Sequence, residues 1–120
     1  MDTSDAIAAL TSLAQETRLT AFRFLVDSHP EAHPAGEIAR VCRVPHNTMS
    51  THLSHLVRAG LITVTRSGRS MLYRADTSGF RALVAFLAHD CCNGRPEICA
   101  PILSALPAAS CDCQPENARG

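Results

Sequence analysis

The sequence contains no lysine, so every cationic side chain apart from histidine is an arginine. It carries no net charge, because 11 basic residues balance 11 acidic ones. No apolar run approaches the length of a membrane span. The first residues have neither the basic nor the apolar segment that directs secretion. These absences argue against a membrane or secreted protein, and we expect a cytoplasmic protein with no membrane partner.

The zero net charge hides an uneven distribution. Residues 1–32 hold two arginines and five acids, and residues 76–120 hold three arginines and five acids. Residues 33–75 hold six arginines and a single glutamate. Guanidinium groups form paired hydrogen bonds with phosphates and guanines, although a GC-rich genome produces the same preference for arginine over lysine. The middle third is therefore the segment that we expect to face DNA.

A chain of 120 residues with 46% hydrophobic content is sized for one domain with a modest core. We assign residues 1–106 to this domain, and residues 107–120 to a flexible tail. The sequence has six cysteines. Thiols stay mostly reduced in the cytosol, which favours metal binding or redox chemistry over structural disulfides.

Apolar spacing of three and four predicts helices in the first half of the chain. Residues 4–28 show this spacing with an interruption at residues 15–17, so two helices are expected there. Two prolines make residues 28–34 a predicted loop. Helices follow over residues 35–43 and 46–59, separated by Pro45 and ended by Gly60. This is a helix-turn-helix arrangement, whose predicted inward residues are Ile38, Ala39, Cys42, Met49, Leu53, Leu56 and Val57.

The outer face of the second helix is a row of short hydrogen-bonding side chains. A helix that reads base edges in the major groove needs such a row in its N-terminal half. The alternative is a solvated helix without a ligand, but such faces usually carry more Glu and Lys. The predicted base-contacting residues are His46, Asn47, Thr48, Ser50, Thr51 and His52.

Two strands are predicted over residues 61–65 and 70–75, joined by a turn with Gly68 at its tip. A hairpin directly after a helix-turn-helix is a wing, and its arginines would lie along DNA phosphates. The fold class is therefore mainly α with a two-stranded β-hairpin. The arginines that we assign to DNA binding are Arg58, Arg66, Arg69 and Arg74.

A last long helix is predicted from a cap at residues 76–78 to about Cys92. Its apolar residues leave almost no polar stripe, so both sides of the helix need cover. In so small a protein a second copy of the chain is the simplest cover, and we predict a two-fold dimer built on the first and last helices. Residues 101–106 are predicted to form a last helical turn.

Residues 89–99 (HDCCNGRPEIC) concentrate three thiols next to a helix stop. Cys92 and Cys99 would stand roughly 10 Å apart on an unbroken helix. Gly94 and Pro96 allow the chain to fold back and bring Cys99 beside Cys91 and Cys92, while Cys99 of the other subunit is the alternative source of the third thiol. These three soft ligands are the candidate input site of a switch.

Three segments resemble the ArsR/SmtB family of winged helix-turn-helix repressors: residues 13–19 (LAQETRL), 49–62 (MSTHLSHLVRAGLI) and 66–74 (RSGRSMLYR). The likeness covers about residues 5–92, and its second segment is the most specific. It implies a winged helix-turn-helix homodimer joined through its terminal helices. It also implies a repressor that leaves an inverted-repeat operator when a toxic metal or metalloid binds.

The sequence departs from the founding arsenic sensors of that family, because residues 34–39 lack their Cys-x-Cys pair. Cys91, Cys92 and Cys99 resemble instead the variant arsenic sensors whose thiols follow the dimer helix. The resemblance thus implies trivalent arsenic, As(III), as the inducer, with antimonite, Sb(III), and methylarsenite as further candidates. Trivalent arsenic prefers three thiolates, whereas closed zinc sites usually take four ligands.

Other interpretations of the thiols remain open. A redox or persulfide sensor would join two of them in a disulfide. A zinc site would combine Asp76, His89 or Asp90 with Cys92. A thiol enzyme would use Cys92 with His89 as its base, and we disfavour it. Cys111 and Cys113 are either auxiliary ligands or without a role, and the other histidines have no spacing typical of metal ligands.

Overall fold

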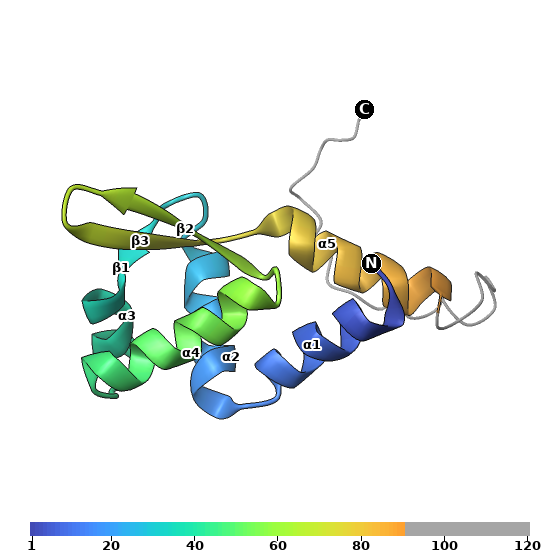
Figure 1. Cartoon of the computed structure of the whole chain (residues 1–120), viewed down its shortest axis with the longest axis horizontal. Helices are drawn as coiled ribbons and strands as arrows, with labels where there is room; N and C mark the ends of the chain where they lie inside the picture. Colours follow the sequence, from blue (N-terminus) through green and yellow to red (C-terminus); the bar gives the residue numbers. More distant parts are fainter. Residues whose placement is uncertain (91–120) are drawn as a thin grey trace. The chain divides into compact units, whose positions relative to one another are not determined.

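The computed structural model describes residues 1–90, with side chains described through residue 88. The chain forms two compact units, Met1–Val84 and Ala85–Gly120, and the second is described only as far as Asp90. Figure 1 labels the main elements. In chain order they are α1 (Thr3–Leu13), α2 (Glu16–Asp27), β1 (His33–Pro34), α3 (Ala35–Cys42), α4 (His46–Arg58), β2 (Ile62–Ser67), β3 (Ser70–Ala75), α5 (Thr77–Ala85) and a π-helix (Phe86–Asp90).

The first two helices begin with side-chain caps. Asp2 accepts a hydrogen bond from the Asp5 amide at 2.8 Å, and Gln15 accepts one from the Arg18 amide at 2.9 Å. Each cap satisfies an amide that the first turn of a helix leaves without a backbone partner. The predicted interruption at residues 15–17 is confirmed, because the Gln15 cap starts α2 there.

The helix-turn-helix prediction is confirmed by α3 and α4. Helix α3 ends at Cys42, and its C-cap Arg43 adopts the left-handed conformation with φ of 61°. Pro45 is the N-cap of α4, and Gly60 follows the helix with φ of 80°. Glycine suits that position because a left-handed residue with a Cβ is strained.

The core lies between α2, α3, α4 and the start of β2. Its members bury the apolar stripes of these helices, as their spacing predicted. Two predictions were wrong, since Cys42 and Val57 are only half-buried. Both lie in the last turn of their helix, where the apolar stripe reaches the edge of the core. The largest fully buried side chains are Leu25, Ile38, Met49, Leu53, Leu56, Leu61 and Ile62.

The wing is a β2–β3 hairpin whose register pairs Ile62 with Ala75 and Ser67 with Ser70. β2 therefore extends two residues closer to the turn than predicted, whereas β3 has the predicted bounds. Gly68 with φ of 61° allows the chain to reverse in two residues. Strand β1 pairs with β3 and makes the sheet three-stranded, in the order β1-β3-β2. The prediction of a plain loop over residues 28–34 missed β1, although a residue before proline favours the extended conformation.

Helix α5 begins directly against the end of α4, and we call the contact among Gly60, Leu61, Asp76 and Gly79 the α4–α5 joint. The Asp76 amide donates to the Leu61 carbonyl at 2.9 Å. The Asp76 carboxylate accepts hydrogen bonds from the Ser78 hydroxyl at 2.7 Å and from the Gly79 amide at 3.2 Å. These bonds, the Ser78 hydroxyl first, hold the pKa of Asp76 below its usual value. The predicted cap of this helix is confirmed.

The last predicted helix differs from the structure in its second half. The α-helix ends at Ala85, and residues 86–90 form a π-helix, in which each amide bonds one residue further back. The predicted end near Cys92, the helical turn at residues 101–106 and the tail from residue 107 lie outside the described residues. None of the helices within residues 1–90 is long and apolar enough to cross a membrane.

Replacing Gly79 tests the α4–α5 joint. A Cβ built at Gly79 would overlap the carbonyl oxygen of Gly60. We expect Gly79→Ala to lower the free energy of unfolding in urea by about 1–3 kcal/mol, the usual cost of overpacking. A Cβ at Gly36, by contrast, would only touch the His46 ring at 3.5 Å. Gly36→Ala in α3 is the control and should be neutral or slightly stabilising, since Ala favours helix over Gly; equal losses in the two variants would contradict the assignment.

Candidate nucleic-acid interface

Helix α4 presents most of its predicted base-contacting side chains to solvent. His46, Asn47, Thr48 and Thr51 are exposed, whereas Ser50 and His52 are half-buried. The Asn47 amide oxygen accepts from the Thr48 amide at 3.0 Å, and the Thr51 hydroxyl donates to the Asn47 carbonyl at 3.4 Å. The Asn47 contact uses only the oxygen of its side-chain amide, so the nitrogen is left to donate to another acceptor.

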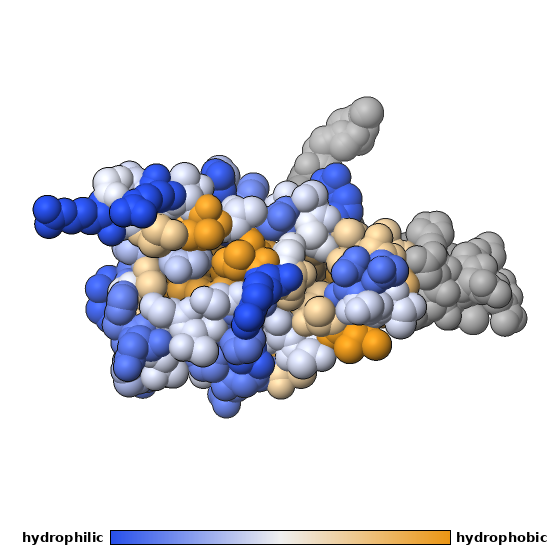
Figure 2. All heavy atoms as spheres, viewed as in Figure 1, coloured by the Kyte–Doolittle hydropathy of each residue, from blue (hydrophilic) through white to orange (hydrophobic). Residues whose placement is uncertain are grey.

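The wing brings three arginines to the surface beside this helix. Arg66, Arg69 and Arg74 are exposed, and no arginine is paired with a carboxylate within the described part of the chain. The Arg66 Nε donates to the Gly68 carbonyl at 3.3 Å, which leaves the rest of its guanidinium outward. Figure 2 shows strongly hydrophilic atoms projecting at the tip of the wing. The wing thus offers three arginines whose charge no carboxylate of the described residues neutralises.

A cavity of about 250 Å³ lies between the wing turn and the starts of α3 and α4. Its lining includes both His46 and Arg69, which the sequence assigned separately to the helix and to the wing. Arg58 lies at the other end of α4, where it lines a second cavity with Gly60 and Gly79. The structure therefore brings His46 of α4 and Arg69 of the wing together, whereas Arg58 lies at the opposite end of α4.

Arg18 ties the corner between α1 and α2 to the middle of α4. Its Nε donates to the Ser12 carbonyl at 2.7 Å, and its NH1 lies 3.2 Å from the Nδ1 of His52. The buried Ser12 hydroxyl donates to the His55 carbonyl at 3.2 Å. Together these bonds fix the position of α4 relative to the first two helices.

His52 is the partner of Arg18 on α4, so one side of its ring is committed to α2. An arginine only donates hydrogen bonds, so the Nδ1 of His52 must accept. Burial, then the charge of Arg18, then that of His55 lower the pKa of His52. The ring is therefore neutral in the neutral pH range, and its assignment to DNA contact stays a prediction.

The described residues contain no group of three or more His, Cys, Asp or Glu side chains able to hold a metal. Cys42 is a free, half-buried thiol, and burial raises its pKa, which makes it a poor source of thiolate. Asp76, considered as a zinc ligand, uses its Oδ1 to cap α5. Cys91, Cys92 and Cys99 lie outside the described residues, as do Cys111 and Cys113, and the same holds for the His89 and Asp90 side chains.

Comparisons with known proteins identify a helix-turn-helix domain in this chain. Residues 13–65 match the model of a family described as a helix-turn-helix domain. The chain is 34% identical over 84 residues, 69% of its length, to the uncharacterised HTH-type transcriptional regulator YdfF of Bacillus subtilis. It spans about a third of that relative, 36% of its length.

Solved structures share most of the described arrangement. An ArsR-like transcriptional regulator from Rhodococcus superposes with a TM-score of 0.67 at 20% identity, over 85% of this chain and 93% of the other. A possible transcriptional regulator for arsenical resistance gives 0.59 at 28% identity, over 66% and 79%. The homodimeric winged helix-turn-helix DNA-binding domain of Mb0332 from Mycobacterium bovis, a possible ArsR-family regulator, gives 0.59 at 22%, over 68% and 73%.

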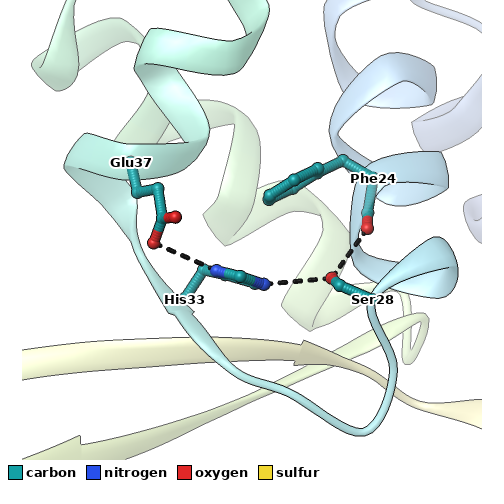
Figure 3. A network of polar contacts seen from close by, with 4 residues as sticks. All are labelled: Phe24, Ser28, His33 and Glu37. Atoms are coloured by element: carbon teal, nitrogen blue, oxygen red, sulfur yellow. Dashed lines mark hydrogen bonds and ion pairs between the residues drawn. The ribbon is translucent and has the colours of Figure 1, made fainter.

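The described residues form a winged helix-turn-helix fold like that of these ArsR-like regulators, and residues 13–65 carry a helix-turn-helix domain. The predicted fold class is thereby confirmed. Sequence reasoning missed the role of Arg18, which was noted only within the segment of residues 13–19. An arginine one helical turn into an amphipathic helix gives no signal that it reaches a second helix. The burial of His33 was also missed, because its partners Ser28 and Glu37 lie in neighbouring elements (Figure 3).

The tie between Arg18 and His52 predicts a pH dependence. The pKa of His52 is lower in the folded protein than its ordinary value of 6.5, so protonation of His52 favours unfolding. The contact between Arg18 and His52 therefore contributes its full stability above pH 6.5, and this contribution is lost as the pH falls through the lowered pKa. Arg18→Ala should cost about 1–3 kcal/mol of unfolding free energy and should raise the NMR titration midpoint of His52. The rise should be partial, because burial remains. Arg23→Ala, another arginine of α2, is the control, and an unchanged His52 midpoint in Arg18→Ala would contradict the tie.

Proposed function

We propose that this protein is a DNA-binding transcriptional repressor whose reading element is α4 and whose wing grips the phosphate backbone. The observation that carries the proposal is the set of exposed side chains on α4, together with wing arginines that pair with no carboxylate among the described residues. The exposed side chains on α4 are His46, Asn47, Thr48 and Thr51. Short polar side chains reach base edges, and arginines supply affinity without sequence choice. The family model that matches residues 13–65 supports this assignment, because helix-turn-helix domains place their second helix in the major groove.

The repressor acts as a homodimer built on α1 and α5. Ile7 and Leu10 of α1 are 58% and 43% exposed, and Phe80 and Val84 of α5 are 42% and 40% exposed. Larger exposed apolar patches mark interaction sites, and these side chains lie on the two helices that the proposal assigns to the dimer. The homodimeric state of the Mycobacterium bovis domain supports the proposal. A two-fold dimer requires an inverted-repeat operator with half-sites about one helical turn, roughly 34 Å, apart.

The inducer is trivalent arsenic bound by Cys91, Cys92 and Cys99. Three cysteines within nine residues directly after the dimer helix support this assignment, because soft thiolates suit a thiophilic metalloid. The 28% identical possible regulator for arsenical resistance supports it as well. Arsenic bound there would bias α5, and the α4–α5 joint would carry the change to the recognition helix. A coupling of about 1–3 kcal/mol weakens DNA binding about 5- to 150-fold, which is enough to relieve repression.

The wing assignment predicts a change in salt dependence. Arg69→Ala should weaken binding to all DNA sequences similarly, because phosphate contacts carry no sequence information. The slope of log affinity against log salt should fall by about 0.9 for each phosphate that the variant no longer neutralises, which makes about 2 for a symmetric dimer. Arg23→Ala on α2 is the charge-matched control and should leave the slope unchanged. An unaltered slope in Arg69→Ala would show that the hairpin is not a wing that touches phosphates.

The assignment of α4 to base recognition predicts that a substitution in this helix changes the preference for operator DNA over unrelated DNA. Asn47→Ala should reduce the preference for operator over unrelated DNA by about 1–3 kcal/mol, the value of one paired base contact. Its affinity for unrelated DNA should change little. Competition gel shifts with the two kinds of DNA measure this difference. An unaltered operator preference would move recognition to other residues of α4.

The inducer assignment is tested by operator release. Cys92→Ser should still bind the operator in a gel shift but should no longer leave it when arsenite is added. Cys42→Ser is the control, since Cys42 is half-buried in α3, and it should be released like the native protein. Zinc and a disulfide oxidant serve as alternative inducers, and release by either of them without arsenite would favour a zinc or redox sensor. Release of Cys92→Ser by arsenite would remove Cys92 from the site.

A further inference from the structure

The ring of His52 is held by an arginine that belongs to another helix. The Arg18 guanidinium donates from its Nε to the Ser12 carbonyl at 2.7 Å, and its NH1 lies 3.2 Å from the Nδ1 of His52. The Arg18 amide donates to the Gln15 side chain at 2.9 Å, which caps α2. The backbone and the guanidinium of Arg18 are thus both anchored at the corner between α1 and α2, and NH1 meets α4.

The contact with Arg18 determines which ring nitrogen of His52 carries a proton. A guanidinium has no acceptor, so the Nδ1 of His52 has to accept and cannot carry a proton itself. A proton on Nδ1 would place two donors 3.2 Å apart with no acceptor between them. Burial first, and then the charges of Arg18 and His55, lower the pKa of His52, so the doubly protonated ring is disfavoured as well. The ring is therefore the neutral tautomer with its single proton on Nε2.

The Nε2 proton of His52 is an unused donor on α4. No acceptor among the described residues takes it, since the hydrogen bond that the His52 side chain makes within them is the one with Arg18. His52 is half-buried, and it lies four residues after the exposed Thr48. Residues four apart share a face of a helix. His52 therefore adds one N–H donor to the helix face on which Thr48 lies.

We propose that Arg18 makes His52 a fixed hydrogen-bond donor to a base in the major groove; this inference rests on the proposed function of α4. In that groove adenine and guanine offer the acceptor N7, guanine also offers O6, and thymine offers O4. Cytosine offers only the donor N4. A donor that cannot become an acceptor therefore selects against cytosine at the base that it contacts. Arg18 is a positioning residue, which acts on sequence choice through His52.

Without the arginine, the same side chain would read DNA less selectively. A neutral imidazole can carry its proton on either nitrogen, and rotation of the ring exchanges its two edges. His52 could then offer an acceptor to cytosine as well as a donor to the other bases. The tie to α2 removes this choice, because Arg18 occupies the accepting nitrogen.

His52→Asn separates the two edges of the ring. The asparagine oxygen can stand where Nδ1 stands and accept from Arg18, but the shorter side chain has no donor at the position of Nε2. The variant should therefore fold and keep its contact with α2. His55→Asn is the matched control, because the Nδ1 of His55 also lies near an arginine, 3.3 Å from the NH2 of Arg58. His55 lies nearer the C-terminal end of α4, whereas the N-terminal residues of a recognition helix contact bases.

Binding-site selection followed by competition gel shifts tests the base contact. The native protein and His55→Asn should exclude cytosine at one position of each half-site, and His52→Asn should tolerate it there. The discrimination against cytosine should fall roughly threefold to tenfold per half-site in His52→Asn, the value of one hydrogen bond. An unchanged base preference in His52→Asn would overturn the contact. An equal loss of affinity for operator and unrelated DNA would indicate a phosphate contact and would overturn base reading as well.

Arg18→Ala, made in two backgrounds, tests the positioning role. In the native background it should lower the preference for operator DNA, because the ring is no longer held. In His52→Asn the donor is already missing, so the loss of preference should be smaller, while the loss of unfolding free energy should remain. Equal losses of preference in the two backgrounds would show that Arg18 acts only by holding α4, and they would overturn the positioning role.

Nitrogen NMR of the DNA-free protein tests the tautomer independently of DNA binding. At about pH 7.5, above the ordinary histidine pKa, His52 should carry a proton on Nε2 and none on Nδ1. A proton on Nδ1 would overturn the proposal whether or not the protein binds DNA. Absent operator binding with the Nε2 tautomer intact would instead be a failure of the proposed function, and the base contact would fall with it.

Discussion

The close approach of Gly60 and Gly79 is the constraint on which the rest of the structure depends. The backbone at Gly60 ends α4, and the first turn of α5 lies so close to it that residue 79 has no room for a side chain. The chain between these two glycines is the wing, whose strands begin at Ile62 and end at Ala75. The two glycines therefore close a loop in which the recognition helix, the wing and the last helix share one junction, sealed by the bond from the Asp76 amide to the Leu61 carbonyl.

Two further ties hold the DNA-facing elements from the opposite side. Arg18 joins the first helices to α4 through Ser12 and His52. His33 joins α2 and α3 to the outer strand of the sheet. Each tie is made by a polar side chain at a junction of elements, while the apolar core fills the space between them. Hydrophobic packing holds the elements together without direction, so these polar bonds are what set their relative orientation.

Local patterns were sufficient to predict most of the fold. The cap at Gln15, the turn at Pro45 and the stop at Gly60 are chemical signals within a few residues of the feature that they determine. The same holds for the wing turn at Gly68. Strand β1 was not predicted, because a two-residue strand has no periodicity and exists only through its pairing with β3. The roles of Arg18 and His33 depend on partners in other elements, as does the closeness of His46 to Arg69, and a single sequence does not encode such proximity locally.

The central claim is that arsenic acts on DNA binding through the α4–α5 joint. Hydrogen exchange of the amides of Leu61, Asp76 and Phe80, measured on DNA-free protein before and after arsenite, tests it most directly. The Asp76 amide donates to Leu61 across the joint, and the Leu61 and Phe80 amides donate to Leu56 and Asp76 on its two sides. The account predicts that arsenite changes their protection while the Val44 amide, in the turn before α4, keeps its exchange rate. Release of the operator by arsenite with unchanged exchange at all three amides would contradict it.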